Sequence, residues 1–169
     1  MPDEIINRVA NSKLQVVDLE DFYPEGKRIA FDIKDWLFEG LVLREKDFRK
    51  HVAEHNWSQY QNAYVALYCS TDAIVPDWAY MLISLQLQDI AKLSVIGNLD
   101  HLESIIYAHI ISELDTSAYK DMPVIIKGCS NKPVPANALV LLSQKLKPVA
   151  KSIMFGEACS SVPLYKRKK

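Results

Sequence analysis

Two stretches of this 169-residue chain repeat each other without a gap. Residues 76–97 (PDWAYMLISLQLQDIAKLSVIG) align with residues 135–156 (PANALVLLSQKLKPVAKSIMFG), and eight of the 22 pairs are identical. The apolar pairs keep the i, i+3, i+4 spacing of one helix face. Strand candidates at 64–68 and 124–127 precede the two stretches at matching places. We interpret this region as an internally duplicated strand–loop–helix–strand unit.

The pattern along the whole chain indicates the fold class. Strand candidates lie at 14–17, 28–33, 41–43, 64–68, 93–96, 124–127 and 152–155, and helix candidates at 3–10, 44–55, 76–90, 102–114 and 135–147. Strands that alternate with helices of about 10–15 residues are typical of βαβ units and a mainly parallel sheet. We therefore predict an α/β fold with helices on the faces of a mainly parallel sheet. One domain is expected, with a smaller α+β portion at 1–62 and the duplicated core at 63–169.

Composition narrows the class of function. The chain has only five glycines and neither a GxGxxG nor a GxxxxGK[ST] motif, which argues against a glycine-rich phosphate-binding loop. Its net charge of −1 gives no general attraction for nucleic acid. The start MPDEIINRV does not resemble a signal peptide, and no apolar run approaches the ~18 residues of a membrane span. We expect a cytoplasmic protein that binds neither nucleic acid nor membrane.

Each of the three cysteines is followed by Ser and then, within seven residues, by Val-Pro. The three segments are YCSTDAIVP at 68–76, KGCSNKPVP at 127–135 and ACSSVP at 158–163. Each cysteine follows a strand candidate, and ligands of open parallel sheets bind outside the carboxyl ends of the strands. We therefore expect Cys69, Cys129 and Cys159 to converge at one sheet edge, with Cys69 and Cys129 at equivalent points of the duplication.

Three converging thiols suggest a metal centre. Zinc takes three cysteines with a fourth ligand or water, and cysteine thiolates also hold iron–sulfur clusters. The duplication aligns Cys159 and Ser160 with Asp100 and His101, which makes Asp100 and His101 candidates for additional ligands. Asp100 has an alternative role as the N-cap of a helix that begins at His101, with Glu103 completing a capping box. No catalytic residue can be assigned.

Ordinary structural roles are expected for the remaining candidates. Solvated loops or tails are expected at DLEDF (18–22), Asp72, Glu157 and KRKK (166–169). Surface or packed positions are expected for the histidines on helical stripes, His51, His55 and His109. Packing in the core or between subunits is expected for Trp36, Trp57 and Trp78.

Several longer motifs resemble an uncharacterised bacterial family of unknown function. They are NRVANS, DLEDFYP, FDIKDWLFEGLVLREKDFR, the three cysteine segments and the ending SIMFGEACSSVPLYKRKK, and together they cover nearly the whole chain. The resemblance brings no known activity. Its association with genetic neighbourhoods of iron–sulfur cluster assembly implies a role related to sulfur or iron, with iron–sulfur assembly proteins as partners.

Three hypotheses of different classes follow. The first is a metal-binding protein, with zinc or an iron–sulfur cluster on the three cysteines, that serves as an accessory factor in iron–sulfur or sulfur handling. The second is a thiol enzyme that uses one cysteine as nucleophile or persulfide carrier. The third is a non-catalytic interaction module whose cysteines are only packed. A homodimer is expected because it is the commonest oligomeric state.

Overall fold

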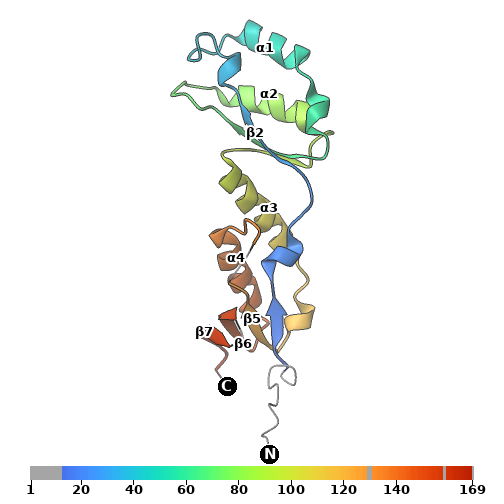
Figure 1. Cartoon of the computed structure of the whole chain (residues 1–169), viewed down its shortest axis with the longest axis vertical. Helices are drawn as coiled ribbons and strands as arrows, with labels where there is room; N and C mark the ends of the chain where they lie inside the picture. The colour runs from blue at the N-terminus through green and yellow to red at the C-terminus, as the bar shows by residue number, and fades with distance from the viewer. Residues whose placement is uncertain (1–12, 129–130, 158, 169) are drawn as a thin grey trace, which may run out of the picture. The chain divides into compact units, whose positions relative to one another are not determined.

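The computed structural model describes residues 13–128, 131–157 and 159–168, so the helix expected at 3–10 lies outside the described residues. The chain divides into two compact units (Figure 1). Unit 1 comprises Met1–Tyr23 and Ile106–Lys169, and unit 2 comprises Pro24–Ile105. In the sequence, unit 2 is therefore an insertion into unit 1. Its second boundary falls within one helix, α3 (Leu99–Glu113), and residue 62 lies inside unit 2.

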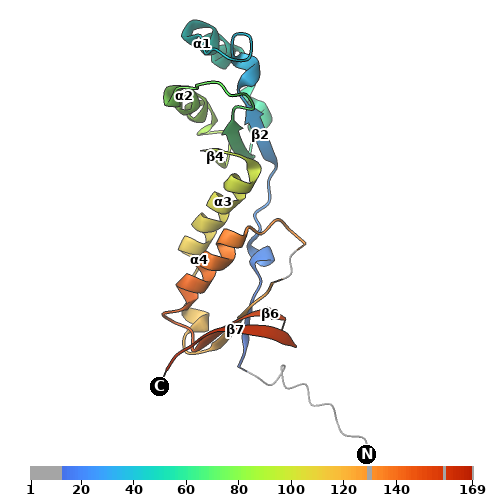
Figure 2. The same ribbon diagram turned by 90° about the vertical axis from the view of Figure 1, so that its left-hand side faces the viewer.

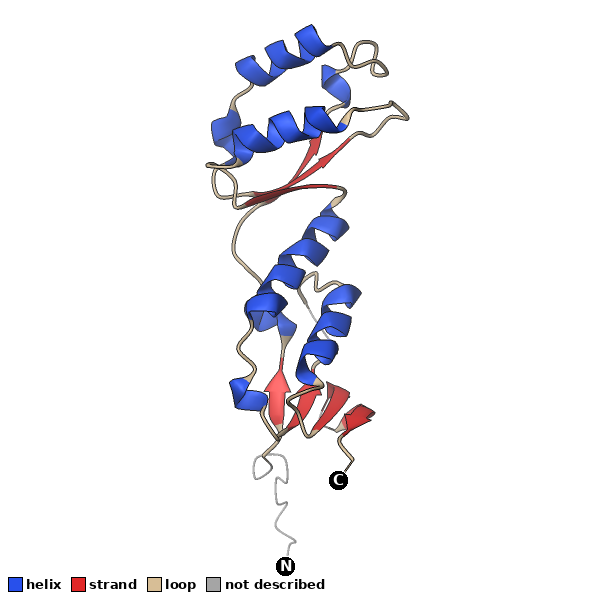
Figure 3. Ribbon diagram, turned by 180° about the vertical axis from the view of Figure 1, so that it is seen from behind, coloured by secondary structure: helices blue, strands red, loops and turns tan. Residues whose placement is uncertain are grey.

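Unit 2 is built on a parallel three-stranded sheet in the order β2-β3-β4. Its elements are β2 (Arg28–Asp32), α1 (Glu45–Glu54), β3 (Tyr64–Tyr68), α2 (Asp77–Leu87) and β4 (Leu93–Ile96). The central strand β3 carries the apolar run Val65–Ala66–Leu67, which is typical of a strand covered on both faces. Phe48 of α1 and Ile83 of α2 are fully buried in the same cluster as Val65, so both helices cover one face of the sheet (Figure 3).

The opposite face of this sheet is joined to the first turns of α3. Arg28 pairs with Tyr64 in the register, whereas Ile29 and Phe31 point to the α1/α2 core, so Arg28 points away from that core. Its Nε donates to Glu103 Oε1 at 2.6 Å, and the two side chains are only 12% and 8% exposed. The pair explains why Glu103, on α3, is the one charged residue that is buried among those described.

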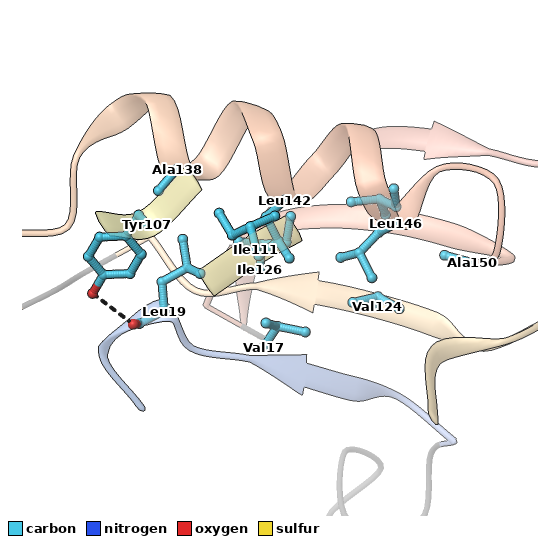
Figure 4. Packing of buried hydrophobic residues seen from close by; sticks show 11 residues of the cluster. Val17, Leu19, Tyr107, Ile111, Val124, Ile126, Ala138, Leu142, Leu146 and Ala150 are labelled. Carbon is cyan, nitrogen blue, oxygen red and sulfur yellow. Dashed lines mark hydrogen bonds between the residues drawn. The ribbon is translucent and has the colours of Figure 1, made fainter. Parts of the chain in front are cut away.

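Unit 1 contains a four-stranded sheet in the order β1-β5-β6-β7. Its strands are β1 (Gln15–Val17), β5 (Pro123–Ile126), β6 (Ser152–Glu157) and β7 (Ser160–Lys166), of which only β7 is antiparallel to its neighbour. The second half of α3 and α4 (Ala136–Leu146) lie side by side over one face (Figures 1 and 2). Tyr107 and Leu142 are buried there against Val124, and the Tyr107 hydroxyl donates to the Leu19 carbonyl at 3.0 Å (Figure 4).

The internal duplication is confirmed in three dimensions. At the 59-residue offset that separates Pro76 from Pro135, β3 matches β5, α2 matches α4 and β4 matches β6. The buried pairs Ala79/Ala138, Ile83/Leu142 and Leu87/Leu146 obey the same offset. So do Phe48/Tyr107 and Val52/Ile111, which match α1 to the second half of α3. The repeat is therefore longer than the sequence comparison indicated, and each unit contains one copy.

The α/β fold and its mainly parallel strands are also confirmed, with some local differences. The strands form two sheets where one was expected. Residues 41–43 form no strand, and an isolated bridge between Phe38 and Val42 closes a turn instead. Strand β7 was not anticipated, because its Ser-Ser-Val-Pro start has the composition of a loop. As an edge strand it tolerates Pro163, whose missing N–H cannot donate to a neighbour.

Candidate functional site

The cysteines do not share one sheet. Cys69 follows β3 of unit 2 directly and is partly exposed, whereas Cys159 lies exposed in the turn between β6 and β7 of unit 1. Cys129 lies outside the described residues. The expectation that the three cysteines meet at one edge assumed a single sheet. Since Cys129 is not described, the shared three-cysteine site stays a prediction. At the 59-residue offset, moreover, Cys69 aligns with Gly128 and Cys129 with Ser70, so the two cysteines are not strictly equivalent.

Cys69 is held in a loop with well-defined partners. Its Sγ lies 3.3 Å from Thr71 Oγ1, and the Thr71 hydroxyl donates to the Gly40 carbonyl at 2.9 Å. Because the single hydroxyl proton of Thr71 is used by Gly40, the Cys69 thiol is the donor in its contact with Thr71. The backbone N–H of Ser70 donates to Asp32 Oδ1 at 3.1 Å. The loop after β3 is thus tied to the last residue of β2 and to the turn at Gly40 that follows β2.

Two ionisable side chains, Asp32 and Tyr80, lie close to the Cys69 loop. Asp32 also accepts the backbone N–H of Lys34 at 3.0 Å. Burial acts to raise the pKa of Asp32, but its hydrogen bonds with Ser70 and Lys34 outweigh burial and lower the pKa, so the carboxylate is charged. Burial raises the pKa of the Tyr80 hydroxyl, on α2, and negative charge on Cys69, Asp32 and Asp77 raises it further. We call Asp32, Cys69, Thr71 and Tyr80 the Cys69 edge.

The matching edge of unit 1 is closed by polar contacts. Lys127 Nζ lies 2.9 Å from Asp18 Oδ2, and the Lys127 hydrogen bond is the main reason that the pKa of Asp18 is lowered. Glu20 Oε1 accepts the backbone N–H groups of Asn131 and, at 3.0 Å, of Lys132. The prediction of a solvated loop at DLEDF is therefore wrong. Its carboxylates bind the segments on either side of Cys129. The sequence around DLEDF could not indicate these contacts, because the partners lie more than 100 residues away.

Asp100 and His101 lie in the first turn of α3. The helix begins at Leu99, and the side chain of Asn98 accepts the N–H of His101 at 2.8 Å. Asn98 is therefore the cap, and the interpretation of Asp100 as the N-cap with a capping box to Glu103 is wrong. Asp100 instead borders a shallow hollow of about 350 Å³, formed with Ala30, Tyr68, Asn98 and Leu99. His101 is exposed.

No three His, Cys, Asp or Glu side chains among the described residues are arranged to hold a metal ion. Since Cys129 is outside that set, the metal site and its ligands stay predictions.

The other histidines and the tryptophans behave as expected. Trp36, Trp57 and Trp78 pack against the core of unit 2. His55 lies among Phe31, Trp36 and Trp57, and its Nε2 is 2.9 Å from the Tyr60 hydroxyl. Burial lowers the pKa of His55. His51, His109, Asp72 and Glu157 are exposed.

Comparison with known proteins places the chain in a family but gives no activity. In the described part of the chain, no helix is long and apolar enough to cross a membrane. No curated protein and no solved structure matches the sequence. Residues 3–167 match the model of a family described as protein of unknown function (DUF2480). The chain therefore belongs to the DUF2480 family.

Proposed function

We propose that this protein is a cytoplasmic thiol carrier that accepts sulfur as a persulfide on Cys69. The observation that carries the proposal is the position of Cys69, partly exposed at the carboxyl end of the central strand β3 and fixed by Thr71. Cys69 packs partly against the core of unit 2 and stays partly exposed, and its place at the ligand-binding edge of a parallel sheet supports a chemical role.

The transfer step needs no external oxidant or reductant. The Cys69 thiolate attacks the outer sulfur of a donor persulfide, R–S–SH, and a new S–S bond forms at Sγ. The S–S bond of the donor breaks, its electron pair leaves with the inner sulfur as R–S⁻, and the proton stays on the transferred sulfur. Thiol–disulfide exchange follows the same course and likewise depends on the thiolate of the attacking group.

The resting loop restrains the Cys69 side chain. Its thiol lies against Thr71 Oγ1, and the Thr71 hydroxyl is itself bound to the Gly40 carbonyl. A restrained thiol of this kind suits a carrier that is engaged when its donor arrives.

Persulfide transfer to Cys69 can be measured directly. Anaerobically purified full-length protein is incubated with glutathione persulfide, alkylated, and mapped by mass spectrometry of its peptides. We expect one additional sulfur atom on Cys69, and no uptake at this position in Cys69→Ser. Cys159→Ser is the matched control, since it removes an exposed thiol of the other unit and leaves uptake by Cys69 intact.

The same preparation separates the two other hypotheses. Stoichiometric zinc or iron that is lost in the triple Cys69/Cys129/Cys159→Ala variant would support the metal centre and contradict the carrier. A Cys69 that resists both persulfide and alkylating agent in the folded protein, and reacts only after unfolding, would support a packed structural cysteine.

A further inference from the structure

A tight turn beside Cys69 displays apolar side chains. Leu41 N–H donates to the Phe38 carbonyl at 3.1 Å, and Phe38 N–H donates to Val42 at 2.8 Å. The two central residues, Glu39 and Gly40, have φ values of 52° and 70°. They lie in the three-residue turn that the Phe38–Val42 bridge closes, and the left-handed conformation is unusual for Glu39. The Thr71 hydroxyl fastens this turn to the Cys69 loop through the Gly40 carbonyl.

The side chains on these two loops point largely into solvent. Leu41 is 58% exposed, Val42 54% and Phe38 40%, while Ile74 in the Cys69 loop is 93% exposed. We call Phe38, Leu41, Val42 and Ile74 the apolar rim. Thr71 joins the two loops through Gly40, and exposed apolar side chains on adjoining loops are typical of interaction sites in soluble proteins. An unusual backbone conformation that is held by a specific hydrogen bond agrees with a functional loop.

The charges on the same loops indicate the kind of partner. Residues 32–44 and 69–77 contain five acidic and two basic side chains. Of the two basic ones, Arg44 lies 3.2 Å above the ring of Phe38, so its charge is engaged by the aromatic face. Two copies of this acidic surface would repel each other, which argues against a homodimer through this face. A partner that complements these loops presents apolar groups surrounded by basic ones.

We propose that the apolar rim is the docking surface for a persulfide-bearing protein, which delivers its sulfur to Cys69. This inference rests on the proposed function. Basic residues of the partner pair with the acidic side chains of these loops and bring its persulfide to Cys69. A small persulfide has no surface to dock, so its transfer does not depend on the rim.

Two donors distinguish docking from chemistry. The rate of sulfur uptake by Cys69 is measured from a bacterial cysteine desulfurase charged with L-cysteine, and separately from glutathione persulfide. In the full-length Leu41→Ser/Val42→Ser variant we expect a loss of roughly tenfold or more with the desulfurase and no change with glutathione persulfide. Leu164→Ser in unit 1 is the control, because Leu164 is exposed to a similar extent, 54%, and lies on the other sheet.

Each other outcome has a definite meaning. Equal desulfurase rates in the wild type and the rim variant overturn the docking surface. A loss with both donors also overturns it, because the rim residues then act by shaping the Cys69 loop. Uptake from glutathione persulfide alone in the wild type excludes delivery by a protein donor of this kind. Failure of Cys69 to take sulfur from either donor overturns the proposed function itself.

Discussion

Asp18 and Asp32 occupy the same place in the two units. The Oδ1 atom of each accepts the N–H of the residue two positions further on, Glu20 and Lys34 respectively, at 3.0 Å. They differ in their second partner. Asp18 pairs with Lys127, whereas Asp32 accepts the N–H of Ser70. One copy of the repeat thus closes its sheet edge with an ion pair, and the other leaves a carboxylate beside an accessible thiol.

Replacing Asp18 tests how much its contacts stabilise unit 1. Asp18→Ala removes the N-cap of a short 3-10 helix (Leu19–Phe22) and the partner of Lys127. We expect a loss of about 1–2 kcal/mol in the free energy of unfolding at pH 7. The pKa of Asp18 is lower in the folded than in the unfolded protein. Its contribution is therefore complete above the ordinary pKa of 3.8 and is lost as the pH falls through the lowered value.

Urea unfolding at several pH values measures both effects. The difference between wild type and Asp18→Ala should be constant from pH 7 to pH 5 and should narrow below about pH 4. A difference that does not change in that range would show that the carboxylate charge has no part in the stabilisation.

His55 predicts a second pH dependence, near neutrality. Burial lowers its pKa in the folded protein below the ordinary value of 6.5. The unfolded chain then takes up the proton first, so stability is full above about pH 6.5 and falls as the pH drops toward the lowered folded pKa. We expect the urea midpoint of the wild type to decrease between pH 7.5 and pH 5.5, and to decrease less in His55→Gln.

The exposed His109 provides the matched control for His55. His109→Gln should retain the pH dependence of the wild type. If His55→Gln loses stability with falling pH as steeply as the wild type does, another group is responsible for the acid sensitivity.

The sequence predicted the repeated elements well because local signals coincide in them. Pro76 and Pro135 precede helices that begin at the next residue, and the buried positions Ile83 and Leu142 keep the helical spacing. The strand predicted at 64–68 has the observed bounds, and its apolar run Val65–Ala66–Leu67 lies between two tyrosines.

The errors concern contacts between residues distant in sequence. A spacing pattern cannot show that β3 and β5 belong to different sheets, because the choice of neighbour depends on β1 and β2 far upstream. The pairs Asp18–Lys127 and Arg28–Glu103 also join residues that are distant in sequence. For this reason Asp18 was expected in solvent and Glu103 in a capping box. Of the site residues, only Cys69 had a recognisable signal, and Thr71 and Tyr80 had none.

Gly156 should resist substitution more strongly than Gly40. Gly156 has a φ of 116°, and an added Cβ would come 2.8 Å from the Ser160 backbone oxygen. Gly40 has a φ of 70°, and an added Cβ there would make only ordinary contact with the Lys34 side chain, at 3.9 Å. We expect Gly156→Ala to cost clearly more than the roughly 1–2 kcal/mol that a left-handed alanine costs at position 40. Thermal unfolding of the two variants compares them, and equal losses would show that the β6–β7 turn relaxes.

Thr71 should control the reactivity of Cys69. In Thr71→Val the hydroxyl that accepts the thiol hydrogen and binds Gly40 is lost, while the side chain keeps its shape.

Timed alkylation followed by peptide mapping should show Cys159 reacting faster than Cys69 in the wild type, because Cys159 is exposed and Cys69 partly buried. In Thr71→Val the rate at Cys69 should rise severalfold while the rate at Cys159 stays constant, since local opening governs access to a partly buried group. Cys159 reacts without any opening of the fold and corrects for reagent activity, and an unchanged urea midpoint of Thr71→Val excludes general destabilisation. An unchanged rate at Cys69 would mean that Thr71 neither restrains the thiol nor holds its loop closed.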